Sequence, residues 1–157
     1  GLGWRALAMG DEEARLSDLV VLADRAAAHP SKFARLRRLL KRSTEPAVVF
    51  TESRDSLVAC HQWLAAGTDL ACLHGGMDVG EREGALRRFL DGHARILLAT
   101  DVASEGLNLQ ARARLVVTLE WPWSPQRLEQ RIGRVDRIGQ ARRVHAVHLT
   151  ARDTFEE

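Results

Sequence analysis

Three arginines spaced three residues apart, Arg131, Arg134 and Arg137, stand in the stretch QRIGRVDRIGQ at 130–140. Residues three or four apart lie on one face of a helix, so this spacing predicts guanidinium groups that crowd together. Like charges so placed repel by roughly 0.2–0.5 kcal/mol per pair unless an anion lies opposite. The stretch therefore indicates an anion-binding site. The alternative is a solvated helix face whose arginines pair with acids nearby, such as Glu129.

The charge distribution favours a phosphate-bearing partner. Residues 126–143 hold six arginines against two acids, whereas residues 1–30 hold three arginines against five acids. The net charge of the whole chain is only +2, so the positive charge is concentrated late in the sequence. Arginine suits phosphate because its planar fork is always charged and pairs with phosphate oxygens.

The composition is typical of one globular domain, with 157 residues of which 45% are hydrophobic and 28% charged. Cys60 and Cys72 stand among apolar neighbours without metal-ligand spacing, so we expect buried, reduced thiols and no metal site. No apolar run is long enough for a membrane span, and no signal peptide is visible. The sequence lacks an initiator methionine and stops at TFEE, so we expect a piece of a longer protein.

Short apolar runs typical of buried strands occur at 46–51, 69–74, 94–100, 112–120 and 144–150. Helical patterns fill the gaps between these runs, with N-caps predicted at Ser53, Asp78 and Ser124 and a further amphipathic helix at 11–27. This alternation predicts a three-layer α/β domain with a mainly parallel sheet of about five or six strands flanked by helices. We expect a linker with the first helix at 1–29, the domain at 30–152 and the start of a following element at 153–157.

Polar residues follow the predicted strands, and ligands in such folds gather at the carboxyl ends of the strands. Thr51 and Arg54 follow the first strand, His74 and Gly75 the second, and Thr100 ends the third. Glycines allow close backbone approach to a phosphate, and hydroxyl groups can bind one. Ordinary structural roles remain open, such as a strand-end hydrogen bond for Thr100 or a turn built by His74.

Five segments in order, VVFTESRDS, LHGGM, ILLATDVASEGLNLQ, LEWPWSPQRLEQ and QRIGRVDRIGQ, resemble the motifs of one family. They are similar to motifs IV, IVa, V and VI of the second RecA-like lobe, or helicase C-terminal domain, of superfamily 2 helicases and translocases. The resemblance covers about residues 30–150. The RIGQ ending and the WPWSP element resemble the Swi/Snf-like branch, which includes bacterial ATPases associated with RNA polymerase. One such motif alone is weak, but five in order are specific.

The resemblance implies roles at a nucleotide. Arg134 and Arg137 would be arginine fingers that reach ATP bound with Mg²⁺ on another lobe, and Gln130 would lie near the attacking water. An arginine supplied across a cleft can raise the rate of phosphoryl transfer by roughly 10³–10⁵. Gly106 and Asn108 match a GxN element beside the ATP sugar and phosphates.

The resemblance also implies a nucleic-acid track formed by Thr51, Arg54, His74, Gly75 and Thr100. A GxN element in place of the GxD of RNA helicases favours double-stranded DNA. Arg131 lies outside the finger set and is expected to pair with an acid nearby. The tryptophans of WPWSP either stack on a base or pack rigidly around the prolines.

The sequence contains no GxxxxGK[ST] phosphate loop, and no DExx magnesium site follows a strand. We therefore expect a C-terminal motor lobe that hydrolyses no ATP alone and completes a cleft with the N-terminal lobe of its parent. The alternatives are a non-hydrolysing nucleic-acid-binding scaffold and an RNA helicase lobe. The expected setting is a cytoplasmic, nucleoid-associated bacterial protein that binds DNA, with RNA polymerase or another DNA-bound complex as a partner and no membrane contact.

Overall fold

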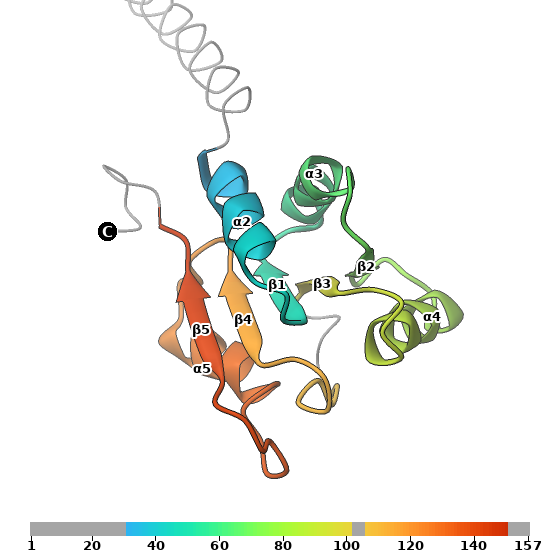
Figure 1. Ribbon diagram of the computed structural model, residues 1–157, viewed down its shortest axis with the longest axis vertical. Helices are drawn as coiled ribbons and strands as arrows, with labels where there is room; N and C mark the ends of the chain where they lie inside the picture. Colours follow the sequence, from blue (N-terminus) through green and yellow to red (C-terminus); the bar gives the residue numbers. More distant parts are fainter. Residues whose placement is uncertain (1–30, 102–105, 151–157) are drawn as a thin grey trace, which may run out of the picture. The chain divides into compact units, whose positions relative to one another are not determined.

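A five-stranded parallel sheet forms the centre of the computed structural model, which describes residues 31–101 and 106–150 (Figure 1). Its strand order is β2-β3-β1-β4-β5, and every neighbouring pair is parallel. The strands are β1 Ala47–Thr51, β2 Leu70–Leu73, β3 Ile96–Thr100, β4 Leu115–Thr118 and β5 His145–His148. Each strand lies inside the run predicted for it, and the predicted mainly parallel sheet is confirmed.

Helices cover both faces of the sheet, which explains why the central strands β1, β3 and β4 are buried throughout (Figure 1). On one face Leu36 and Leu57 join the same apolar cluster as Val49, and on the other Phe89 joins the cluster of Val48. Neighbouring residues of β1 thus point to opposite faces, as the pleat of a strand requires. The helices are α2 Ser31–Arg42, α3 Arg54–Leu64, α4 Val79–Leu90 and α5 Pro125–Gly133.

Side-chain caps fix the starts of two helices next to the strand ends. The Ser53 hydroxyl accepts the backbone N–H of Ser56 at 3.0 Å. Asp78 and Glu81 form a capping box, in which each side chain accepts the backbone N–H of the other. Helix α5 begins with proline as predicted, but Ser124 makes no side-chain cap bond. Two of the three predicted caps are therefore confirmed.

Both cysteines are free thiols, Cys60 buried and Cys72 half-buried. Burial raises the pKa of Cys60 to about 12, because a thiolate is poorly solvated among apolar side chains. Within the described ranges, no helix is long and apolar enough to span a membrane.

The chain divides between Ser31 and Lys32 into two units, and the whole sheet belongs to the second. The helix predicted at 11–27 and the element predicted at 153–157 lie outside the described residues, so the predicted domain limits remain a prediction. Because all five strands are parallel, their carboxyl ends lie along one edge of the sheet, where the predicted site residues follow them.

Candidate functional site

A hollow of about 280 Å³ at the end of α5 is lined by Gln130, Gly133, Arg134 and Arg137. We name it the arginine hollow. Arg137 is exposed and Arg134 half-buried, and among the described residues neither forms an ion pair. The structure therefore brings together the three residues expected to act at a nucleotide. Two guanidinium groups that have no ion pair in the described part of the chain, beside a side-chain amide, are a suitable donor set for phosphate oxygens.

The expected helix through all three arginines is not observed. Helix α5 ends at Gly133, Arg134 is its C-cap, and Arg137 lies in the turn that follows. The three side chains therefore do not share one helix face, and they meet different surroundings. Arg131, within the helix, is 2% exposed, whereas the two arginines of the hollow remain accessible.

Arg131 is the centre of a buried polar cluster. Its guanidinium donates to both carboxylate oxygens of Asp101, at 2.7 and 2.8 Å, and to the carboxylate of Glu52. It also donates to the backbone carbonyl of Glu120 at 3.1 Å and lies 5.7 Å from the ring centre of Phe50. We call Arg131, Asp101, Glu52 and Glu120 the Arg131 cluster. The expectation that Arg131 pairs with an acid holds, but the acids come from the ends of β1 and β3 and not from Glu129.

Two neighbouring carboxylates explain how the charge of Arg131 can be buried. Burial alone would lower the pKa of Arg131, but hydrogen bonds and charges from Asp101, and then from Glu52, raise it above its ordinary value. The guanidinium is thus fully charged, and its burial is compensated by two carboxylates that remain about a quarter exposed, at 26% and 27%.

Glu120, two residues after the end of β4, links the Arg131 cluster to the loop after β1. Its carboxylate accepts the backbone N–H of Glu52 at 2.7 Å and the hydroxyl of Ser56. Arg127 of α5 lies 3.5 Å from the Glu52 carboxylate. The ends of β1, β3 and β4 are therefore joined to α5 by side chains. Sequence analysis gave Glu52 and Glu120 no role, because the partners of their carboxylates lie 64 or more residues away.

A second group of predicted residues gathers at the ends of β1 and β2. The Nδ1 of His74 accepts the backbone N–H of Gly76 at 3.2 Å, which shapes the turn after β2. The Arg54 guanidinium lies 3.5 Å from the position that a Cβ on Gly76 would occupy. Gly75 and Arg54 are exposed. This edge therefore presents an arginine, a histidine and accessible glycine backbone together.

Thr51 and Thr100, which end β1 and β3, are both buried. Thr51 is fully buried and its hydroxyl donates to the carbonyl of Ser53 at 3.2 Å. The predicted contact between Thr51 and a phosphate does not fit this arrangement, because the hydroxyl is already used locally. Thr100 is 8% exposed and lies directly before Asp101 of the Arg131 cluster.

Gly106 and Asn108, expected beside the nucleotide, are both exposed. Gly106 has φ +77°, a left-handed conformation that side-chain-bearing residues rarely adopt. The motif thus has a glycine where the backbone requires one.

Gln140 is a structural residue that sequence analysis did not identify. Its side-chain nitrogen donates to the carbonyls of Gln110, Ala113 and Val135, at 3.1 to 3.3 Å. It therefore ties the segment after α5 to the segment before β4. In the sequence, Gln140 is notable only as the last residue of the RIGQ element, which resembles the Swi/Snf-like branch. Its structural role could not be predicted, because the carbonyl partners cannot be read from the sequence.

The two tryptophans of WPWSP lie in different environments. Trp121 contacts His148 of β5 edge-on, with ring centres 5.2 Å apart, while Trp123 is 87% exposed. The intervening Pro122 is buried. Packing therefore accounts for Trp121 and Pro122. Burial, and next the charge of Arg131, lower the pKa of His148.

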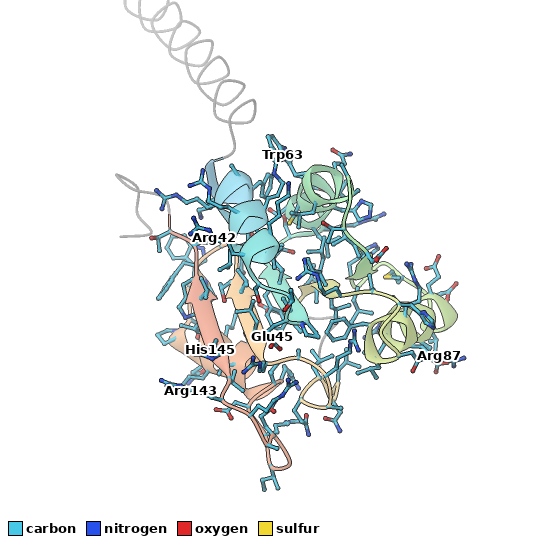
Figure 2. All side chains as sticks on the ribbon, viewed as in Figure 1. Arg42, Glu45, Trp63, Arg87, Arg143 and His145 are labelled. Carbon is cyan, nitrogen blue, oxygen red and sulfur yellow. The ribbon has the colours of Figure 1, made fainter. Side chains whose placement is uncertain are left out.

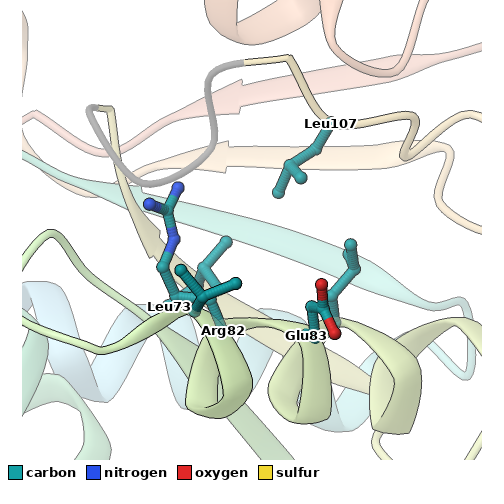
Figure 3. A pocket seen from close by; sticks show the side chains of 6 residues that line it. Leu73, Arg82, Glu83 and Leu107 are labelled. Atoms are coloured by element: carbon teal, nitrogen blue, oxygen red, sulfur yellow. The ribbon is translucent and has the colours of Figure 1, made fainter.

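A second hollow, of about 190 Å³, lies beside α4 and has an apolar lining from Leu73, Val79, Leu86 and Leu107. Figure 3 shows Arg82 and Glu83 on α4 and Leu107 on the segment that faces the helix. This lining does not suit phosphate oxygens, in contrast to the arginine hollow.

Comparison with known proteins identifies the family. The model of the helicase conserved C-terminal domain matches residues 31–139, and the chain belongs to this family. The predicted membership is thereby confirmed.

Three curated relatives agree with this assignment. An uncharacterized ATP-dependent helicase, YqhH of Bacillus subtilis, is 33% identical over 81% of this chain and 23% of its own length. The ATP-dependent RNA helicase DbpA of Escherichia coli is 37% identical over 69% of this chain and 24% of its own length. The RNA polymerase-associated protein RapA of Cronobacter sakazakii is 42% identical over 53% of this chain and 9% of its own length. The chain therefore spans a quarter or less of each relative.

A solved structure confirms the RecA-like fold. The E. coli DEAD-box protein SrmB, bound to the regulator of ribonuclease activity A, superposes with a TM-score of 0.66 at 32% identity. The match covers 74% of this chain and 68% of that chain.

Proposed function

We propose that this chain is the C-terminal motor lobe of a nucleic-acid-dependent ATPase that translocates on double-stranded DNA. The observation that supports this most strongly is the arginine hollow, where Arg134 and Arg137 lie together without an acidic partner among the described residues. Bound ATP would supply the γ-phosphoryl group that is transferred to water. The arginines would stabilise the negative charge on that group, with Gln130 oriented toward the attacking water.

The ATP and its Mg²⁺ would be held mainly by an N-terminal lobe of the parent protein. The donors of the arginine hollow fit phosphate oxygens, and Gly106 and Asn108 would lie beside the sugar and phosphates. Among the described residues, no three His, Cys, Asp or Glu side chains cluster to hold a metal. The isolated chain, whose sequence contains no phosphate loop, is therefore expected not to hydrolyse ATP.

The nucleic-acid backbone would lie along the carboxyl edge of the sheet, against Arg54, His74, Gly75 and Thr100. Such contacts position a strand without reading its sequence, as a translocating motor requires. The Arg131 cluster would transmit force between this edge and the arginine hollow, because Asp101 follows Thr100 and Arg131 lies one turn before Arg134. The parent would act in the cytoplasm on nucleoid DNA, with RNA polymerase or another DNA-bound complex as a partner.

The test is ATP hydrolysis by the full-length protein with and without duplex DNA. Arg137→Ala is expected to lower turnover by roughly 10³ or more while ATP binding is retained. Arg143→Ala, which removes an exposed arginine outside the hollow, is the matched control and should hydrolyse like the wild type. Wild-type turnover in Arg137→Ala would contradict the assignment of the finger.

The second candidate is an RNA helicase lobe, which the similarity to DbpA favours. Comparing stimulation by duplex DNA, duplex RNA and single strands separates it from the first. Absence of hydrolysis with every nucleic acid would instead support a non-hydrolysing scaffold.

A further inference from the structure

Helix α2 has an outer face composed almost entirely of cations. The helix, SKFARLRRLLKR, contains six basic residues and no acidic one. Leu36 and Leu40 are buried against the sheet, at 0% and 3% exposure, so the basic side chains are left on the outer face. Five of them are exposed and define what we call the α2 basic surface: Arg35, Arg37, Arg38, Lys41 and Arg42 (Figure 2 labels Arg42).

These cations are not neutralised by the described part of the chain, where none of the five forms an ion pair. Arg37 with Lys41 and Arg38 with Arg42 are like charges four residues apart, a spacing that disfavours the helix unless an anion compensates. By contrast, Arg114 nearby forms an ion pair with Glu45.

The α2 basic surface also has a concave shape. A hollow of about 310 Å³ is lined by Ala34, Arg37, Arg38, Lys41 and Arg42. The Arg37 guanidinium lies 5.8 Å from the ring centre of Trp63, which is 36% exposed, and this contact favours one position of the Arg37 side chain. Several cations thus converge on one space that is open to an anion.

The helix that presents this surface is held firmly in place. The Arg95 guanidinium donates to the carbonyls of Leu40, Ser43 and Glu45, at 3.0, 2.9 and 3.3 Å. It therefore satisfies the Leu40 carbonyl in the last turn of α2 and two carbonyls of the segment that follows the helix. The backbone that carries this surface therefore needs little ordering when a partner binds.

The α2 basic surface is separate from the candidate nucleotide site. Leu36 and Leu40 of α2 pack in the cluster on one face of the sheet. Val135, which follows α5, packs in the cluster on the other face, and the arginine hollow lies at that end of α5. An anion bound at α2 would therefore lie outside the arginine hollow, and no residue of the strand-end track lines the hollow at α2.

We propose that the α2 basic surface is a second nucleic-acid contact, which binds backbone phosphates of a duplex outside the track at the strand ends. The inference rests on the proposed function, because that function brings a long phosphate backbone to this same domain. Four of the five cations are arginine, whose fork pairs with phosphate oxygens, and such contacts need no base sequence. The contact would strengthen binding of the motor to the duplex.

The test is binding of the full-length protein to a labelled DNA duplex over a series of salt concentrations, without nucleotide. Arg38→Gln/Arg42→Gln removes two charges from α2, and glutamine preserves helix propensity. We expect the slope of log K against log salt to fall by about 1.8, close to 0.9 for each phosphate that is no longer neutralised. Arg87→Gln/Arg88→Gln, which removes two exposed charges from the last turn of α4, is the matched control and should leave the slope unchanged.

An unchanged slope in Arg38→Gln/Arg42→Gln, with a native circular dichroism spectrum, would overturn the inference. So would loss of binding to a polyaspartate peptide in that variant with duplex binding intact, which would assign the surface to an acidic protein partner. A separate readout, ATP turnover, tests the proposed function. Turnover at saturating duplex should be unaffected by the α2 substitutions, whereas Arg137→Ala should reduce turnover and leave the salt slope unchanged.

Discussion

The Arg131 cluster allows one prediction to be worked out from contacts. Replacing Arg131 by methionine, which is similar in length, removes the buried guanidinium and leaves Asp101 and Glu52 without their shared cation. Breaking a buried ion pair on one side typically costs about 3–5 kcal/mol. Because the two carboxylates are 26% and 27% exposed, water can partly replace the lost donor, so we expect the low end of that range, about 3 kcal/mol.

The measurement is the free energy of unfolding of this chain in urea, together with its thermal midpoint. A loss of about 3 kcal/mol in a domain of this size corresponds to a decrease in Tm of roughly 6–12 °C. Arg137→Met is the matched control, because Arg137 is exposed and has no ion pair among the described residues. Its cost should stay within about 0.5 kcal/mol.

A double-mutant cycle decides whether the cost comes from the ion pair. Asp101→Asn removes one of the two carboxylates that share the Arg131 guanidinium, so Arg131→Met should be less costly in that background, with a coupling energy of about 1 kcal/mol or more. The reasoning is refuted if Arg131→Met costs less than about 1 kcal/mol, or if the two substitutions are additive.

Two further predictions concern other residues of the site. Gln140→Ala should lower the free energy of unfolding by about 1–3 kcal/mol, because the carbonyls of Gln110, Ala113 and Val135 lose their shared donor. The measurement is the urea midpoint. A midpoint unchanged from the wild type would show that water replaces the lost side-chain donor. The lowered pKa of His148 means that below its ordinary pKa of 6.5 the unfolded chain takes up a proton that the folded chain does not. The free energy of unfolding should therefore fall as pH falls from about 6.5 toward the pKa of His148 in the folded state. His148→Phe should reduce this fall, measured by urea titrations at pH 7.5 and 5.5. Equal pH dependence in the wild type and in His148→Phe would contradict the prediction.

Local sequence patterns predicted most of the fold, because local interactions determine where the strands and the helix caps form. Strands that are covered on both faces need continuous apolar runs, and the five observed strands lie within such runs. Ser53 and Asp78 cap helices through bonds that reach only three residues along the chain. The end of α5 was less predictable, because the arginine periodicity continues past Gly133 although the helix does not.

The sequence by itself determined the alternation of strands and helices, the family, and the concentration of arginines at 127–143. The family resemblance separated Arg131 from Arg134 and Arg137, but neither it nor the spacing of the arginines could predict which carboxylates pair with Arg131 or that its guanidinium is buried. Only the tertiary structure decided that Arg131 points to Asp101 and Glu52 and is buried, while Arg134 and Arg137 line an open hollow. The physical reason is that burial of a charge depends on carboxylates at the ends of other strands, and the parallel sheet alone brings those strand ends to α5.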